Sequence, residues 1–196
     1  MFIQVIQAPC TRREDVRAVL DSWRSELADG ANGWLGGTFG ITDDDQLVAV
    51  VRFSSREEAM ANSDRAEQGA WAERLAAALD GPPEFRDYDD VMTFLDGGSD
   101  DAGFVQVIQG RVEDPEVIRK LLETTGELRE ARPEIIGGTV GLAEDGTFTE
   151  TIAFTDEESA RKGEQLEPPP EVRELLGQAM VGASFHDLRD PWFESP

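Results

Sequence analysis

The sequence predicts an α+β protein built from two ferredoxin-like β-α-β-β-α-β repeats, which pair as a pseudo-dimeric α+β barrel. Two observations support this prediction. First, the 196-residue chain contains four segments that recur in the same order about a hundred residues later. Second, the hydrophobic periodicity and the turn residues indicate the same order of elements in both halves.

Four pairs of segments define the repeat. Residues 2–7 recur as residues 104–109, with five of the six residues identical. The other pairs are 35–41 with 136–142, 53–59 with 154–160, and 85–87 with 185–187. The offset falls from 102 to 101 to 100 residues along the chain, as expected when loops lose single residues between elements of fixed length. Four matches in one order indicate a duplication.

The first repeat begins with a strand over residues 2–7, where apolar residues alternate with glutamines. A helix is expected next, because Thr11 and Glu14 have the spacing of a capping box. Its apolar residues fall on one helical face: Val16, Val19, Leu20, Trp23 and Leu27. The remaining elements are strands at 35–42, 47–53 and 85–95, and a helix from 54 or 55 to 79. Ser55 and Glu58 have capping-box spacing at the start of that second helix.

The second repeat has the same order of elements. Asp114 is expected to cap its first helix and Pro115 to start it, while Asp145 and Gly146 form a hairpin turn. Three prolines at 168–170 interrupt its second helix. The domain boundaries expected from these repeats are 1–96 for the first repeat, 97–103 for the linker and 104–196 for the second repeat.

A β-α-β-β-α-β unit places both helices on one face of an antiparallel sheet and leaves the other face uncovered. That face is too apolar to remain in water. The two repeats are therefore expected to close their open faces against each other, so that the second repeat takes the place of a partner subunit. This pairing is compatible with a monomer and with a homodimer.

The composition excludes several classes of function. The chain has 41 acidic and 18 basic residues and a formal charge of −23, so its field repels nucleic acid and anionic membranes. Cys10 is its single cysteine, which excludes an internal disulfide and a cluster of cysteine ligands. No metal and no cofactor is expected. The N-terminal strand has no basic leader, and the apolar run at 47–51 is too short to span a bilayer. We expect a cytoplasmic protein.

Residues 51–62 resemble a known family. An aromatic residue, Phe53, and a serine precede a Glu-Ala pair, and a polar residue, Asn62, follows three positions later. This pattern is similar to the strand-to-helix signature of antibiotic-biosynthesis monooxygenase-like domains in the dimeric α+β barrel superfamily, which often have Trp and His at these two positions. The second repeat has Gly163 opposite Asn62. The resemblance implies a tandem duplication of this fold, but the superfamily contains oxygenases, haem enzymes, isomerases and sensing domains.

Several kinds of site can be set aside. Haem binding in this superfamily generally needs a helical histidine, and the only histidine, His186, lies on a predicted strand. No Gly-x-Ser-x-Gly elbow accompanies it. The glycines at 36 and 37 lie inside a predicted strand and are expected to mark a bulge rather than a nucleotide loop. The aspartates at 43–45 lack the spacing of a calcium loop and are expected to form a turn.

Two groups of residues are candidates for a ligand site. Gln4 and Gln106 are expected on equivalent strands, as amides that line the barrel or brace it. The polar segment around Asn62, Arg65 and Trp71 has no counterpart in the second repeat. By resemblance to cofactor-free monooxygenase-like domains, it offers an amide and a cation for an oxyanion and an indole for stacking. Trp71 also fits a core position.

Three functions are compatible with these residues. The protein is expected to bind a small apolar or phenolic metabolite without turnover, because no dedicated general base is evident. The first alternative is a cofactor-independent monooxygenase-like enzyme acting on a planar phenol or quinol. The second is a filled barrel with a structural or interaction role. If a ligand binds, its pocket is expected in the first half, against residues 62–71. It should be anionic or phenolic, because Arg65 would supply positive charge.

Overall fold

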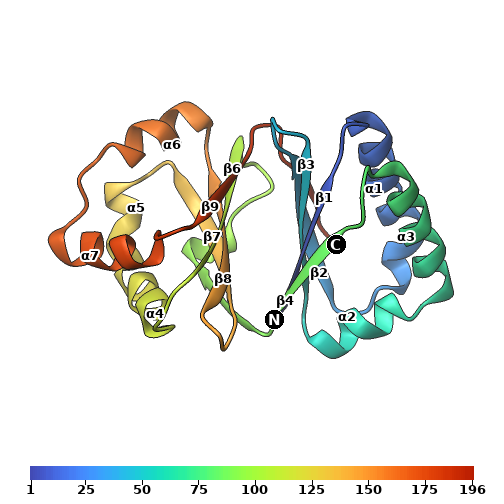
Figure 1. Ribbon diagram of the computed structural model, residues 1–196, viewed down its shortest axis with the longest axis horizontal. Helices are drawn as coiled ribbons and strands as arrows, with labels where there is room; N and C mark the ends of the chain where they lie inside the picture. The colour runs from blue at the N-terminus through green and yellow to red at the C-terminus, as the bar shows by residue number, and fades with distance from the viewer. The chain divides into compact units, whose positions relative to one another are not determined.

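The computed structural model describes residues 1–196, except for the side chain of Glu127, and the chain forms two compact units. Unit 1 consists of Met1–Asp89 together with Trp192–Pro196, and unit 2 consists of Asp90–Pro191. Each unit has one antiparallel sheet with helices on one of its faces (Figure 1). No helix in the described part of the chain is long and apolar enough to cross a membrane.

Unit 1 has the predicted ferredoxin-like order of elements, with one additional strand. Its elements are β1 (Phe2–Pro9), α1 (Arg13–Leu27), η1 (Ala28–Gly30), β2 (Trp34–Ile41), β3 (Gln46–Phe53), α2 (Arg56–Ser63), α3 (Ala66–Ala78), β4 (Glu84–Tyr88) and the C-terminal β10 (Trp192–Glu194). The strand order is β10-β2-β3-β1-β4. The helix-side core joins α1 and α3 to the sheet through Val16, Leu20, Leu47, Trp71 and Leu75.

The helices of unit 1 agree with the prediction in part. Ser55 caps α2 as expected, because its side chain accepts a hydrogen bond from the Glu58 backbone N–H at 3.2 Å. The expected capping box at Thr11 is wrong: α1 has no side-chain cap, and the Thr11 Oγ1 donates to Asp80 instead, at 2.8 Å. The single helix predicted to end at residue 79 is two helices, α2 and α3. Residues 62–64 are weak helix formers, and Arg65 between the helices is extended.

The prediction of a single strand over residues 85–95 is wrong, because the chain leaves one sheet and enters the other at Asp89. Residues before it form β4 in unit 1, and residues after it form β5 (Asp90–Phe94) at the edge of the sheet of unit 2. Conversely, β10 belongs to the second repeat but pairs with β2 in unit 1, with Trp192 opposite Phe39. The boundaries expected at 96 and 104 describe the sequence repeats, whereas each compact unit contains an edge strand from the other repeat.

Unit 2 has the same architecture, but the segment equivalent to α1 is divided into shorter helices. Its elements after β5 are η2 (Leu95–Gly97), β6 (Phe104–Arg111), α4 (Glu116–Glu123), η3 (Thr124–Glu127), α5 (Leu128–Ala131), β7 (Ile135–Leu142), β8 (Thr147–Phe154), α6 (Glu157–Glu164), α7 (Pro170–Ala179) and β9 (Ser184–Leu188). The strand order is β5-β7-β8-β6-β9. The hairpin turn at Gly146 is confirmed by its φ of +83°. The proline-rich interruption separates α6 from α7 as predicted.

The glycine pairs of the repeat form bulges, as predicted, and each bulge lies where an exchanged strand approaches. The pairing register shifts between Trp34 and Gly36 in unit 1 and between Ile135 and Gly137 in unit 2. A Cβ atom on Gly36 would lie 2.7 Å from the backbone oxygen of Glu194 in β10. A Cβ atom on Gly137 would lie 2.3 Å from the backbone oxygen of Leu95, just after β5. The glycines therefore make room for the exchanged strands.

This geometry gives a stability prediction. Gly36→Ala is expected to lower the free energy of unfolding of unit 1 by about 1–3 kcal/mol, because Gly36 has a φ of +116° and its Cβ would contact β10. Gly69→Ala in α3 is the matched control: its Cβ would have no atom within 4 Å, so it is expected to stabilise the helix by up to about 1 kcal/mol. Urea unfolding of both variants measures the difference, and equal effects would contradict the assigned role of Gly36.

Candidate functional site

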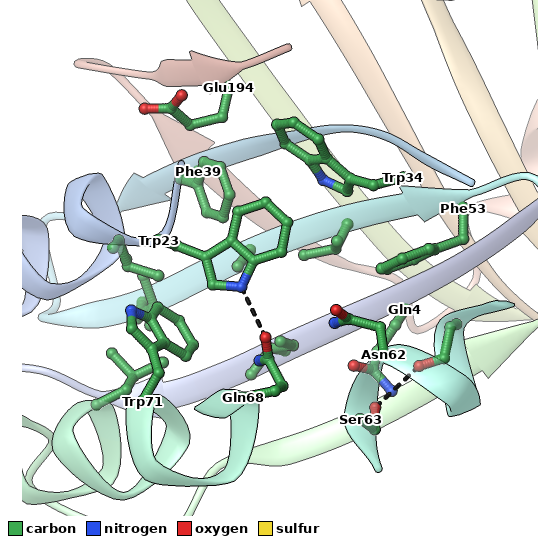
Figure 2. A pocket seen from close by; sticks show the side chains of 17 residues that line it. Gln4, Trp23, Trp34, Phe39, Phe53, Asn62, Ser63, Gln68, Trp71 and Glu194 are labelled. Carbon is green, nitrogen blue, oxygen red and sulfur yellow. Dashed lines mark hydrogen bonds between the residues drawn. The ribbon is translucent and has the colours of Figure 1, made fainter. Parts of the chain in front are cut away.

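A cavity of about 90 Å³ lies in unit 1 between the sheet and helices α1, α2 and α3 (Figure 2). We call it the unit 1 cavity. Its wall is mostly apolar and combines residues of both sheet and helices: Gln4, Ile6, Leu20, Trp23, Trp34, Phe39, Leu47, Ala49, Val51, Phe53, Ala59, Asn62, Ser63, Gln68, Trp71, Leu75 and Glu194. It lies in the first half of the chain and against residues 62–71, where a pocket is expected from the sequence.

Three indole rings and two phenyl rings form much of the wall. The rings of Trp23 and Trp34 are in tilted contact, with centroids 4.7 Å apart. The Trp23 Nε1 donates a hydrogen bond to the Gln68 Oε1 at 2.8 Å, and the Trp71 Nε1 donates to the Val19 backbone oxygen at 3.0 Å. Because these two N–H groups are satisfied within the protein, the indoles offer their apolar surfaces to a ligand. Trp71 therefore belongs both to the core and to the cavity wall.

Two amides supply polar groups to this apolar wall. The Gln4 Nε2 donates to the Asp87 Oδ1 at 3.0 Å, which leaves the Gln4 Oε1 as an acceptor. The Oδ1 of Asn62, whose side chain is buried, accepts a hydrogen bond from the Arg65 Nη1 at 2.9 Å. Among the described residues, no acceptor is bound to the Asn62 Nδ2, so this group remains a donor. The cavity can thus offer one acceptor and one donor to a small polar group.

Arg65 lies outside the unit 1 cavity. Its Nη1 donates to the Leu27 backbone oxygen at 3.1 Å as well as to Asn62, and its Nε donates to the Glu67 Oε1 at 3.1 Å. It lines a separate hollow of about 660 Å³, of which Asn62 is also part. The structure therefore places Arg65 behind Asn62, where it holds the amide. The expectation that an anion inside the pocket would meet this guanidinium is not supported by the geometry.

Gln4 and Gln106 occupy equivalent positions in different units. The Gln106 Nε2 donates to the Asp187 Oδ1 at 2.9 Å, as Gln4 does to Asp87. Gln4 faces the helices of unit 1, since it lines a cavity whose other wall is helical. Gln106 is likewise on the helix-covered face of its own sheet. The two amides therefore do not line one shared interior, and the structure brings only Gln4 together with Asn62 and Trp71.

Several residues of the cavity wall have no sequence signal that marks them as part of a site. Trp23 is recognisable there only as a core residue of the first helix, and Gln68 only as part of a polar segment. Glu194 comes from β10, and its carboxylate lies 3.5 Å from the Arg24 guanidinium. No local pattern predicts that residues at 192–194 pair with those at 37–39, which are more than 150 positions away.

The comparisons agree with this architecture. No family model and no curated protein sequence matches the chain. Solved structures do: a "putative monooxygenase" from Fusobacterium nucleatum has a TM-score of 0.72 at 9% identity, covering 99% of this chain and 94% of the other. A "putative monooxygenase" from Lactobacillus acidophilus has a TM-score of 0.69 at 11% identity, covering 95% and 92%. An anthrone oxidase-like protein has a TM-score of 0.67 at 10% identity, covering 99% and 92%.

These matches extend over nearly the whole of each chain, so the likeness includes both units and not one repeat alone. At about 10% identity they establish the fold and leave the chemistry to be argued from the residues. The chain therefore shares the tandem ferredoxin-like fold of these solved structures, which is the fold that the resemblance in its sequence implies.

Proposed function

We propose that unit 1 binds a small planar phenolic metabolite in the unit 1 cavity and releases it unchanged. The observation that supports this best is the composition of the wall, where aromatic faces enclose a space that holds two amides with unused hydrogen-bonding groups. An aromatic ring would pack against Trp23, Trp34 and Phe53. Its hydroxyl group would donate to the Gln4 Oε1 and accept from the Asn62 Nδ2.

The size and charge of the cavity narrow the ligand class. A volume of about 90 Å³ limits the ligand to no more than a single ring, because an engineered apolar cavity that holds benzene in another protein is larger, at about 150 Å³. The wall contains one carboxylate, Glu194, and no lysine or arginine. A neutral phenol is therefore favoured over a phenolate or a carboxylic acid, because an anion would lose its hydration without gaining a cationic partner.

A second candidate is a cofactor-independent monooxygenase-like reaction on the same phenol, with dioxygen as the oxidant. The names of the structural neighbours favour it, as does the Asn62 Nδ2, which could stabilise a phenolate oxygen. The reaction would need a base, and the only carboxylate in the wall, Glu194, is already held by Arg24. Consumption of dioxygen on mixing with phenols would support this candidate over simple binding.

The binding proposal is tested with two matched fluorinated probes, 4-fluorophenol and 4-fluorotoluene, followed by ¹⁹F NMR. Gln4→Leu is expected to weaken 4-fluorophenol binding about three- to tenfold, because one hydrogen bond is lost, and to leave 4-fluorotoluene binding unchanged. Gln106→Leu is the control, since it removes the same amide from the equivalent strand of unit 2. Equal losses for both probes, or the same loss in both variants, would contradict the proposal.

A further inference from the structure

Glu150 has an unusual position in unit 2. It lies on β8, the central strand of the sheet, directly opposite Ile108 on β6 and Val140 on β7. Directly opposed residues in an antiparallel sheet project from the same face. Ile108 and Val140 belong to the core that α4 and α7 cover, so the Glu150 side chain is also on the helix-covered face.

Solvent reaches Glu150 although its neighbours are buried. Glu150 is partly exposed, whereas Ile108, Val140 and Phe148 on the same face are at most 5% exposed. Because β8 has a strand on each side, this access must come from the helix-covered face. The helical cover is also less regular here than in unit 1: the eight-residue α4 is followed by the short helices η3 and α5, whereas the equivalent α1 is one helix of fifteen residues.

The Glu150 carboxylate has no partner among the described residues, in which no hydrogen bond or ion pair to it is found. Six apolar helical side chains pack on this face: Val117, Ile118, Leu121, Leu122, Leu128 and Leu175. Burial raises the pKa of the Glu150 carboxyl to about 7. The other charged groups on the same face are paired. Asp187 is bound to Gln106 and paired with Arg161 and Arg189. Arg119 of α4 contacts Met92, which lies beside Val140, and is paired with Asp90 and Glu116. An unpaired acid here is costly to the fold unless a ligand uses it.

Gln106 supplies a second polar group near Glu150. It lies on β6 opposite Ile152, which is two residues from Glu150 on β8, so the two side chains are diagonal neighbours on one face. The Gln106 Nε2 is bound to Asp187, and its Oε1 is left as an acceptor. The Glu150 carboxylate and the Gln106 Oε1 are therefore two neighbouring hydrogen-bond acceptors. Unit 1 has no such pair, because Ala49 is the counterpart of Glu150.

We propose that unit 2 holds a second binding site, in which a small organic ammonium ion with an apolar body donates hydrogen bonds to the Glu150 carboxylate and the Gln106 Oε1. An ammonium group carries three donors and no acceptor, which matches two acceptors in an apolar wall. Its charge compensates the carboxylate, and the formal charge of −23 attracts cations to the protein. The site is independent of the proposed phenol site in unit 1.

The test compares n-butylammonium with n-butanol, which has the same apolar body without the charge. Binding is followed by NMR through the side-chain amide signals of Gln106, in phosphate buffer at pH 8. We expect n-butylammonium to bind at least tenfold more tightly than n-butanol, and to shift the Gln106 signals. Glu150→Gln, which keeps the shape of the side chain, is expected to abolish this preference. Glu144→Gln, at the exposed end of the same hairpin, is expected to preserve it.

Three results would overturn the proposal: equal binding of the alcohol and the ammonium ion, a preference for the ammonium ion that survives Glu150→Gln, or shifts confined to unit 1. A folded Glu150→Gln variant is confirmed by the unchanged backbone spectrum of unit 2. If that variant does not fold, Gln106→Leu serves as a second test. It is expected to reduce the preference for n-butylammonium over n-butanol several-fold. No reduction in that test would also count against the site.

Discussion

Replacing Glu150 with glutamine is expected to stabilise the protein by about 3 kcal/mol at pH 8 and by less than about 1 kcal/mol at pH 5. Burial raises the pKa of this carboxyl in the folded protein from 4.5 to about 7. The folded state therefore binds the proton more tightly than the unfolded state does. The stability that this proton contributes is fully present below about pH 4.5 and is lost as the pH rises through 7. Glutamine has no proton to lose.

Urea unfolding of the wild type, Glu150→Gln and the surface control Glu144→Gln at pH 5 and pH 8 measures this effect. The buffers must contain no amine, because an ammonium ligand of Glu150 would stabilise the ionised wild type and reduce the difference. A pH-independent effect of Glu150→Gln, or an equal effect of Glu144→Gln, would show that Glu150 is not held in an apolar environment.

Filling the unit 1 cavity is expected to abolish phenol binding without unfolding the protein. Ala49 is buried in the sheet and lines the cavity, so Ala49→Leu would place three more carbon atoms in a space of about 90 Å³. We expect affinity for 4-fluorophenol to fall at least a hundredfold. The free energy of unfolding should stay within about 1.5 kcal/mol of the wild type, since the added atoms occupy empty apolar space.

Ala61→Leu on α2 is the control for this variant, because Ala61 is exposed and outside the wall of the cavity. It is expected to bind 4-fluorophenol as the wild type does. Retained binding in Ala49→Leu would mean that the phenol binds elsewhere. Lost binding in Ala61→Leu would mean that α2 as a whole, rather than the cavity, determines affinity.

The fold was predictable because its signals are local and occur twice. The repeat of residues 2–7 at 104–109, the capping box at Ser55 and the turn glycine at 146 each specify an element from a few neighbouring residues. The failed cap at Thr11 has a distant cause: Asp80, at the far end of the repeat, accepts its hydroxyl hydrogen bond. Local spacing cannot reveal such a competing partner.

The candidate site was predictable only in part, for a related reason. Gln4, Asn62 and Trp71 line the unit 1 cavity. Their place was predictable, because alternation in a strand and periodicity in a helix indicate which side chains share a face. Arg65 lies behind Asn62 because the helix breaks at that position. Weak helix formers in the sequence indicate such a break, but they do not show where the next side chain points. Glu194 reaches the cavity through the exchange of β10, a long-range pairing with no local signature.

Intermolecular NOEs between phenol and the alanine methyl groups of the protein test the central claim most directly. Ala49 and Ala59 line the unit 1 cavity from the sheet and from α2, while Ala160 is the counterpart of Ala59 in unit 2. At saturating phenol we predict NOEs from the ring protons to the methyl groups of Ala49 and Ala59, and none to Ala160. NOEs only to unit 2, or none to Ala49 and Ala59 although phenol binds, would contradict a phenol site in unit 1.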